Sequence, residues 1–181
     1  MKVLVAGIGN IFLGDDAFGC EVVKRLGQTS FPENVRVVDF GIRGFDLVYA
    51  LMDEYDFTIL VDAVPGGGPP GTVYEIEPDL AELDSSAGSP TSIETHGMDP
   101  LKVLRMAKAM GAKFGKLILV GCEPETFGPE EGKMGLSPSV AEAVDRGVQV
   151  VTKLVNQFNN ENAQIWEGRG YGQEQGIGES T

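Results

Sequence analysis

Short runs of consecutive apolar residues alternate along this chain with segments whose apolar residues recur at helical spacing. The runs lie at residues 2–6, 35–39, 57–61 and 117–120. Runs of this length are typical of strands that are buried on both faces of a sheet. The helical segments follow at residues 18–26, 47–55, 100–110 and 140–158. Strands that alternate with helices predict a three-layer α/β/α sandwich around a mostly parallel sheet.

The same patterns predict how the chain is divided. Residues 72–76 alternate apolar and polar side chains, as expected of a strand near a sheet edge. We expect one α/β domain over residues 1–158, which is long enough to bury a substantial core. Residues 159–181 are rich in Gly, Gln, Glu and Asn and show little periodicity. We expect them to form a disordered or loosely docked tail.

Charge and composition exclude several classes of partner. The formal net charge is -13, so nucleic acids and anionic membrane surfaces should be repelled. No apolar stretch approaches the ~18 residues that a membrane span needs. Met1 leads directly into a strand-like run, which predicts no signal peptide. Cys20 and Cys122 match no zinc or redox spacing. We therefore expect a soluble, cytoplasmic protein, and a monomer.

Three side chains form a candidate site. Asp16 follows the first predicted strand, Asp62 follows the third, and the only histidine, His96, lies in a Ser-, Thr- and Gly-rich loop. Functional residues of parallel α/β sheets gather at the carboxyl ends of strands, so the three could meet at one sheet edge. Two carboxylates and one imidazole suit a borderline divalent metal ion and leave open positions for water or substrate.

Simpler interpretations exist for each residue, and two familiar sites are disfavoured. His96 could be a surface residue, Asp16 a helix cap, and Asp62 a loop residue bonded to nearby backbone N–H groups. Glu123 is more simply read as a solvated loop carboxylate. The loop at residues 7–14 fails the dinucleotide fingerprint, because Phe12 stands where the third glycine belongs. The chain also has no Gly-x-Ser-x-Gly nucleophile turn.

Several segments together resemble the [NiFe]-hydrogenase maturation endopeptidases. The similarity covers nearly the whole chain except the tail, and its most specific parts are the first loop and the Asp-Ala strand end. The segments are Gly7-Ile-Gly-Asn-Ile-Phe-Leu-Gly-Asp-Asp-Ala-Phe-Gly19, Val61-Asp62-Ala63, Pro70-Gly71-Thr72, the loop histidine and Gly135-Leu-Ser-Pro138.

The resemblance implies a cytoplasmic protease, grouped with the aspartic-type endopeptidases. Such a protease removes a C-terminal extension from a hydrogenase large-subunit precursor after nickel insertion. Carried over by motif, Asp16, Asp62 and His96 would bind the nickel, which arrives with the precursor rather than as a resident cofactor. Asp16 or Asp62 would then serve as the catalytic base. The implied fold is a five-stranded mixed sheet, with residues 72–76 as the antiparallel strand.

Two departures from the family pattern bear on the partner. The position of Asp16 often holds glutamate in the family, and residues 39–44 differ from the version in better-known members. Two other functions stay open from the sequence alone. One is a non-catalytic, nickel-dependent checkpoint or chaperone for the precursor. The other is a metallohydrolase that carries its own metal ion and acts on a small molecule.

Overall fold

The structure is a computed structural model that describes residues 1–81, 99–129 and 132–170, with side chains to residue 162. The elements are β1 (Val3–Ile8), a 3-10 turn η1 (Gly14–Ala17), α1 (Phe18–Leu26), β2 (Val35–Gly41), α2 (Gly44–Leu51), β3 (Phe57–Ala63), β4 (Val73–Ile76), α3 (Pro100–Ala109), β5 (Lys116–Cys122) and α4 (Pro138–Gly170). Each predicted strand and helix is present.

The described strands form one mixed sheet in the order β2-β1-β3-β5-β4. Pairing is parallel from β2 through β5, while β4 runs antiparallel to β5 at one edge. This arrangement confirms the predicted mostly parallel, five-stranded sheet and its antiparallel edge strand. The chain passes from β1 to β2 on one side and then returns to β3 on the other side of β1, so the direction of the connections reverses between β1 and β3.

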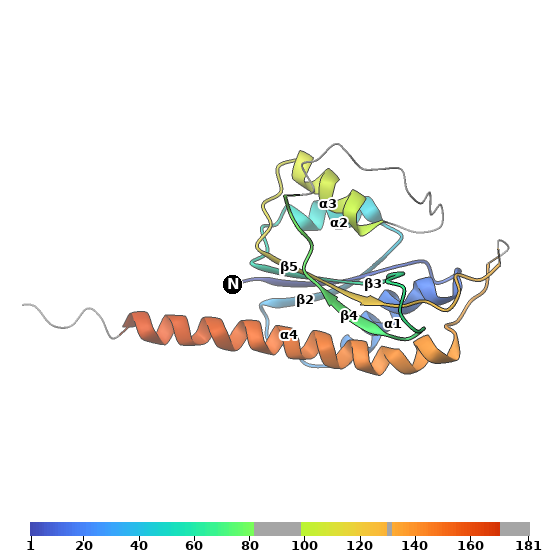
Figure 1. Cartoon of the computed structure of the whole chain (residues 1–181). Helices are drawn as coiled ribbons and strands as arrows, with labels where there is room; N and C mark the ends of the chain where they lie inside the picture. Colours follow the sequence, from blue (N-terminus) through green and yellow to red (C-terminus); the bar gives the residue numbers. More distant parts are fainter. Residues whose placement is uncertain (82–98, 130–131, 171–181) are drawn as a thin grey trace, which may run out of the picture.

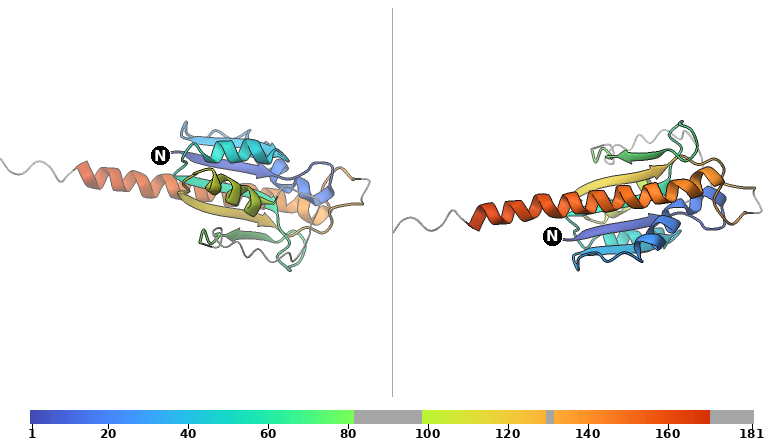
Figure 2. Two further views of the ribbon diagram at one scale, coloured as in Figure 1. Left: turned by 90° about the horizontal axis from the view of Figure 1, so that it is seen from above. Right: turned by 90° about the horizontal axis from the view of Figure 1, so that it is seen from below.

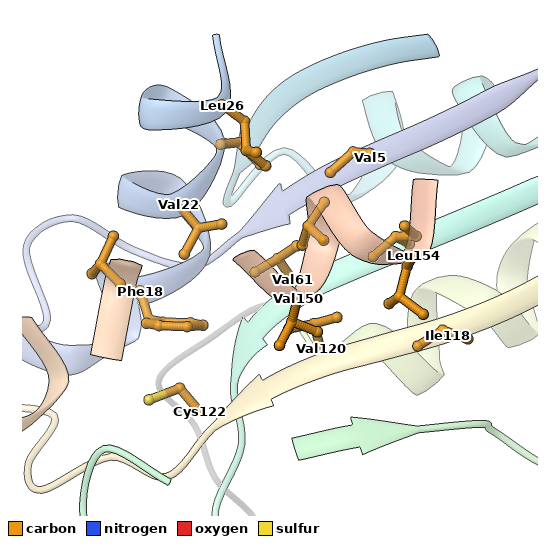
Figure 3. Close-up of a cluster of buried hydrophobic side chains, with 14 of the residues drawn as sticks. Val5, Phe18, Val22, Leu26, Val61, Ile118, Val120, Cys122, Val150 and Leu154 are labelled. Atoms are coloured by element: carbon orange, nitrogen blue, oxygen red, sulfur yellow. The ribbon is translucent and has the colours of Figure 1, made fainter. Parts of the chain in front are cut away.

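Two helical layers cover the sheet. Figures 1 and 2 show α2 and α3 on one face and α1 and α4 on the other. Side chains alternate along β1 accordingly, because Val3 and Val5 pack toward α1 and α4, while Leu4 packs toward α2 and α3. Figure 3 shows the first of these cores, in which Phe18 of α1 and Val150 of α4 meet the inner strands.

Two glycines allow α1 to lie directly against the sheet. A Cβ atom on Gly19 would lie 2.1 Å from the Val61 carbonyl oxygen and 2.3 Å from that of Ile8. A Cβ on Gly7 of β1 would lie 2.4 Å from a Val23 methyl group of α1. In the dinucleotide fingerprint the third glycine lets the helix pack closely on the strand, and Phe12 stands at that position here. In this chain Gly7 and Gly19 allow the close contact instead.

Helix α4 extends past the predicted domain boundary. The apolar stripe ends at Phe158, whose ring packs 4.9 Å from that of Phe57. The helix nevertheless continues to Gly170 and projects beyond the sheet (Figure 1). The predicted boundary at residue 158 is therefore not the end of the helix, because each residue added to a helix that has already formed gains a backbone hydrogen bond. Residues 171–181 lie outside the described part of the chain.

Length alone does not make α4 a membrane helix. Among the described helices, none combines the length and the apolar character that crossing a bilayer requires.

Gly19→Ala should destabilise the fold by about 3 kcal/mol, because the added methyl group meets backbone atoms of β1 and β3 that have little room to move. Urea unfolding followed by circular dichroism would measure this loss. The control is Gly27→Ala at the end of the same helix, where the nearest atom lies 3.4 Å from the new Cβ. Equal stability of the two variants would contradict the role of Gly19.

Candidate functional site

Asp16 and Asp62 lie at the carboxyl ends of β1 and β3, where the strand order reverses. Such a switch point is the usual position of ligand sites in α/β sheets. Asp62 is the penultimate residue of β3, and Asp16 lies in η1, between β1 and α1. Their exposed fractions are only 5% and 7%. The structure thus places both residues at this edge of the sheet, and the charge of Asp16 acts on Asp62.

The backbone around Asp16 is tightly constrained. Gly9 has a φ of +134°, and a Cβ there would lie 1.7 Å from the Asp16 carbonyl oxygen. The N–H of Asn10 donates a hydrogen bond of 2.7 Å to the Asp16 carboxylate. The glycine-rich loop therefore folds back on η1 and holds the Asp16 side chain in place.

The two carboxyl groups disfavour each other's charge. Burial raises the pKa of Asp62 well above its ordinary value, and the negative charge of Asp16 raises it further. A hydrogen bond of 2.8 Å from the Ala63 N–H opposes this shift, and the charge of Asp99 adds to it. Burial also raises the pKa of Asp16, although the hydrogen bond from Asn10 opposes this shift. No ion pair within residues 1–81, 99–129 and 132–162 involves Asp16 or Asp62. The pair is thus a site that a cation would stabilise.

The neighbouring Asp15 has a different environment. Its buried carboxylate accepts hydrogen bonds from the N–H groups of Glu125 (2.8 Å), Thr126 (3.0 Å) and Ser137 (2.6 Å), and from the Ser137 hydroxyl (3.0 Å). The interpretation of Asp15 or Asp16 as a helix cap is wrong, because α1 has no side-chain cap. Asp15 instead fastens both ends of the connection between β5 and α4.

Glu123 organises a second loop. The sequence favoured a solvated carboxylate here, but Glu123 is buried and accepts hydrogen bonds from the Tyr74 hydroxyl (2.7 Å) and the N–H groups of Gly66 (2.7 Å) and Gly68 (3.2 Å). The Tyr74 bond is the largest cause of a lowered Glu123 pKa; burial opposes it and the loop N–H groups add to it. Glu123 therefore holds the glycine- and proline-rich loop against β4.

Both cysteines are free and buried. Burial, followed by the charge and hydrogen bonding of Asp39, raises the pKa of Cys20 to about 12, and the charges of Asp16 and Asp62 add to this shift. Burial likewise raises the pKa of Cys122 to about 12, with the charges of Asp15 and Glu123 contributing. Neither thiol is therefore prepared to act as a nucleophile at neutral pH.

His96 lies outside the described residues, so its predicted place in the site remains a prediction. The nearest described residue after it in the chain is Asp99, whose side chain accepts the Leu101 N–H at 2.9 Å and caps α3. The charge of Asp99 acts on Asp62. Within the described residues, no group of three or more His, Cys, Asp or Glu side chains is placed to hold a metal ion.

An open groove begins at Ala17, the residue after Asp16. It has a volume of about 720 Å³ and runs along α1, with the segment 134–136 and the start of α4 as its other wall. A smaller pocket of about 280 Å³ shares Ile11, Cys20 and Asp39 with it and continues toward Arg43. No pattern in the sequence indicates this groove, because its walls come from segments far apart in the chain.

Asp62→Asn should stabilise the protein, increasingly so as the pH rises. The folded-state pKa of Asp62 is raised, so the folded protein binds more protons than the unfolded chain above the ordinary value of 3.8. Wild-type stability therefore falls as the pH rises from that value through the folded-state pKa, and asparagine removes this loss.

Thermal unfolding of both proteins across this pH range would measure the difference in melting temperature. The gain should vanish below pH ~4, where aspartate is protonated in both states. Exposed Glu33→Gln serves as the control and should show no such trend. A gain for Asp62→Asn that is the same at every pH would contradict the raised pKa.

Asp15→Asn should lower the free energy of unfolding by about 3 kcal/mol, because an amide NH₂ would face donors that now reach a carboxylate oxygen. Hydrogen exchange at the Glu125, Thr126 and Ser137 amides should accelerate at the same time. The control is exposed Asp53→Asn, whose ion pair with Arg36 spans 3.9 Å and should contribute under ~1 kcal/mol. Unchanged protection of the three amides would refute the anchoring role of Asp15.

Comparison with known proteins agrees with the fold. A family model described as hydrogenase maturation protease matches residues 20–154, a span that includes Asp62 and His96 and begins just after Asp16. A putative hydrogenase maturation protease of Methanocaldococcus jannaschii is 34% identical over 150 residues, which cover 82% of this chain and 93% of the relative.

Solved structures agree as well. The hydrogenase maturating endopeptidase HybD from Escherichia coli superposes with a TM-score of 0.69 at 26% identity, covering 87% of this chain and 93% of that one. The hydrogenase 2 maturation peptidase from a Thaumarchaeota archaeon has a TM-score of 0.65 at 32% identity, covering 86% and 99%. The chain therefore belongs to the hydrogenase maturation protease family.

Proposed function

We propose that this protein is the endopeptidase that removes the C-terminal extension of a [NiFe]-hydrogenase large-subunit precursor after nickel insertion. Asp16, Asp62 and His96 recognise the nickel, which is part of the substrate. The observation that carries the proposal is the pair of buried carboxyl groups at the switch point, in a chain of this protease family. Each accepts a backbone N–H, but neither forms an ion pair within the described residues.

The electrostatics of the pair support recognition of a cation. The fold buries two acidic groups at one edge of the sheet and raises their pKa values, so the folded protein is less stable when both are ionised. A divalent ion reverses this effect, because an opposite charge close by favours the carboxylate form. Nickel in the precursor would therefore bind the pair with release of protons, whereas a precursor without nickel would leave the repulsion uncompensated.

The same arrangement suggests how hydrolysis proceeds. Binding of the precursor's nickel fixes the scissile peptide bond beside Asp16 and Asp62. One carboxylate takes a proton from a water molecule, whose oxygen attacks the scissile carbonyl carbon, and the proton passes to the departing amine. The metal ion can polarise the carbonyl or the water. This is a proteolysis of aspartic type in which a substrate metal replaces part of the usual carboxylate dyad.

The position of His96 fits this proposal on one further point. Asp99 is three positions after His96 in the sequence, and its charge acts on Asp62. His96 is thus close in sequence to Asp99, a residue whose charge acts on one carboxyl group of the pair. A neutral imidazole would complete a set of two oxygen ligands and one nitrogen ligand, which suits nickel.

Asp16→Asn, Asp62→Asn and His96→Ala should each lower the rate of precursor processing about 100-fold or more, because each removes a nickel ligand or the base. The measurement is incubation with nickel-loaded precursor and mass spectrometry of the released peptide. Glu33→Gln, an exposed charge change, is the control and should process at the wild-type rate. Full processing by His96→Ala would remove that residue from the site.

Two measurements separate the other functions. Binding of the nickel-loaded precursor by the wild-type protein without release of a peptide would favour a non-catalytic checkpoint. Stoichiometric, tightly held metal in the purified protein would favour a metallohydrolase with its own ion. The proposal predicts peptide release from the nickel-loaded precursor only, and little metal in the free protein.

A further inference from the structure

The groove along α1 has the dimensions of a peptide site. Its volume of about 720 Å³ lies within the range of small-ligand pockets and is too small for the surface of a folded partner. Its floor runs from Ala17, at the end of η1, along α1 to Arg25, which is ~12 Å of helix. That length matches about four residues of extended chain.

One end of the groove adjoins the acidic pair. Ala17 follows Asp16 directly, and the Cys20 thiol at the groove lies within reach of the charges of Asp16 and Asp62. If a peptide is cleaved beside the acidic pair, the residues next to its scissile bond therefore lie in the groove.

The lining changes in character along its length. Ile11 and Met134, which line the groove, expose 42% and 67% of their surface. Exposed large apolar side chains beside a concave site indicate a binding surface. Lys24 and Arg25 line the other end of the groove. Glu21 also lines this end and pairs with Lys24, and Arg25 pairs with Asp145. Both pairs are exposed and therefore weak, so an anionic group of a ligand can compete with Glu21 and Asp145 for the two cations.

The wall that carries Met134 is held in place before any ligand binds. Lys133 donates its N–H to the Phe12 carbonyl at 2.8 Å and accepts the Gly14 N–H at 2.7 Å. The Ser137 bonds to Asp15 fasten the same segment three residues after Met134. A wall that is already ordered reduces the entropy lost on binding an extended peptide.

We infer that this groove binds the precursor's C-terminal extension, as an extended segment of about four residues that starts at the scissile bond. Apolar side chains of the extension pack on Ile11, Met134 and Leu136, and an anionic group, either an acidic side chain or the terminal carboxylate, lies at Lys24 and Arg25. The inference rests on the proposed function and names the part of the substrate that the groove recognises.

Met134→Glu tests the apolar wall in the processing assay. It should raise KM about tenfold and leave kcat unchanged, since it removes binding outside the reacting groups. The control is Met110→Glu, another exposed methionine, which follows α3 and lies outside the groove; it should change neither constant. Circular dichroism would verify that both variants are folded.

Lys24→Gln tests the cationic end with a synthetic peptide of the sequence that the wild-type protein releases. The peptide should inhibit wild-type processing competitively, and Lys24→Gln should weaken the inhibition several-fold, whereas exposed Lys153→Gln should not. Amidation of the peptide terminus would show which anionic group is bound.

The outcomes distinguish the two proposals. If the wild-type protein processes the precursor and Met134→Glu keeps the wild-type KM, the groove assignment is overturned while the protease stands. The same holds if Met134→Glu alters self-association in size-exclusion chromatography and leaves KM unchanged, since the groove would then bind a second copy. Failure of the wild-type protein to release any peptide would overturn both.

Discussion

The direct contact of α1 with β1 and β3 is the constraint on which the rest of the structure depends. Gly7 and Gly19 leave no Cβ atom between the helix and the sheet, so the first turn of the helix lies over the carboxyl ends of these strands. This contact places Asp16 close to Asp62, and it makes the exposed side of α1 the floor of the groove. The acidic pair and the groove therefore share one structural origin.

The buried acidic residues near this edge divide into two kinds by their surroundings. Asp15 and Glu123 each accept several hydrogen bonds and order a loop. Asp16 and Asp62 have few donors for their charge, and burial raises their pKa values. The loops that Asp15 and Glu123 order surround Asp16 and Asp62. A cation that reaches this edge of the sheet therefore meets carboxyl groups whose ionised form it stabilises.

Much of the fold follows from local patterns in the sequence. The apolar runs, the alternation at residues 72–76 and the Asp99-Pro100 helix start each report a strand or helix through nearby residues. Asp62 could be predicted at the sheet edge because it ends such a run. The roles of Asp15 and Glu123 could not, since the partners of Asp15 lie more than a hundred positions away and those of Glu123 about fifty. The continuation of α4 past Phe158 could not be predicted, because residues 159–170 show no apolar periodicity in the sequence.

The sequence by itself determined the order of strands and helices, the edge strand at residues 72–76 and the acidic residues at two strand ends, because hydrophobic periodicity is a local property. The antiparallel direction of that strand was implied only by the family resemblance. Tertiary structure alone decided which of the adjacent residues Asp15 and Asp16 would order a loop and which would remain uncompensated. It also built the groove, whose walls join residues 11, 24 and 134. Such features arise when distant segments of the chain meet. Only then are the hydrogen-bond partners and the burial of each side chain, and hence their energies, determined.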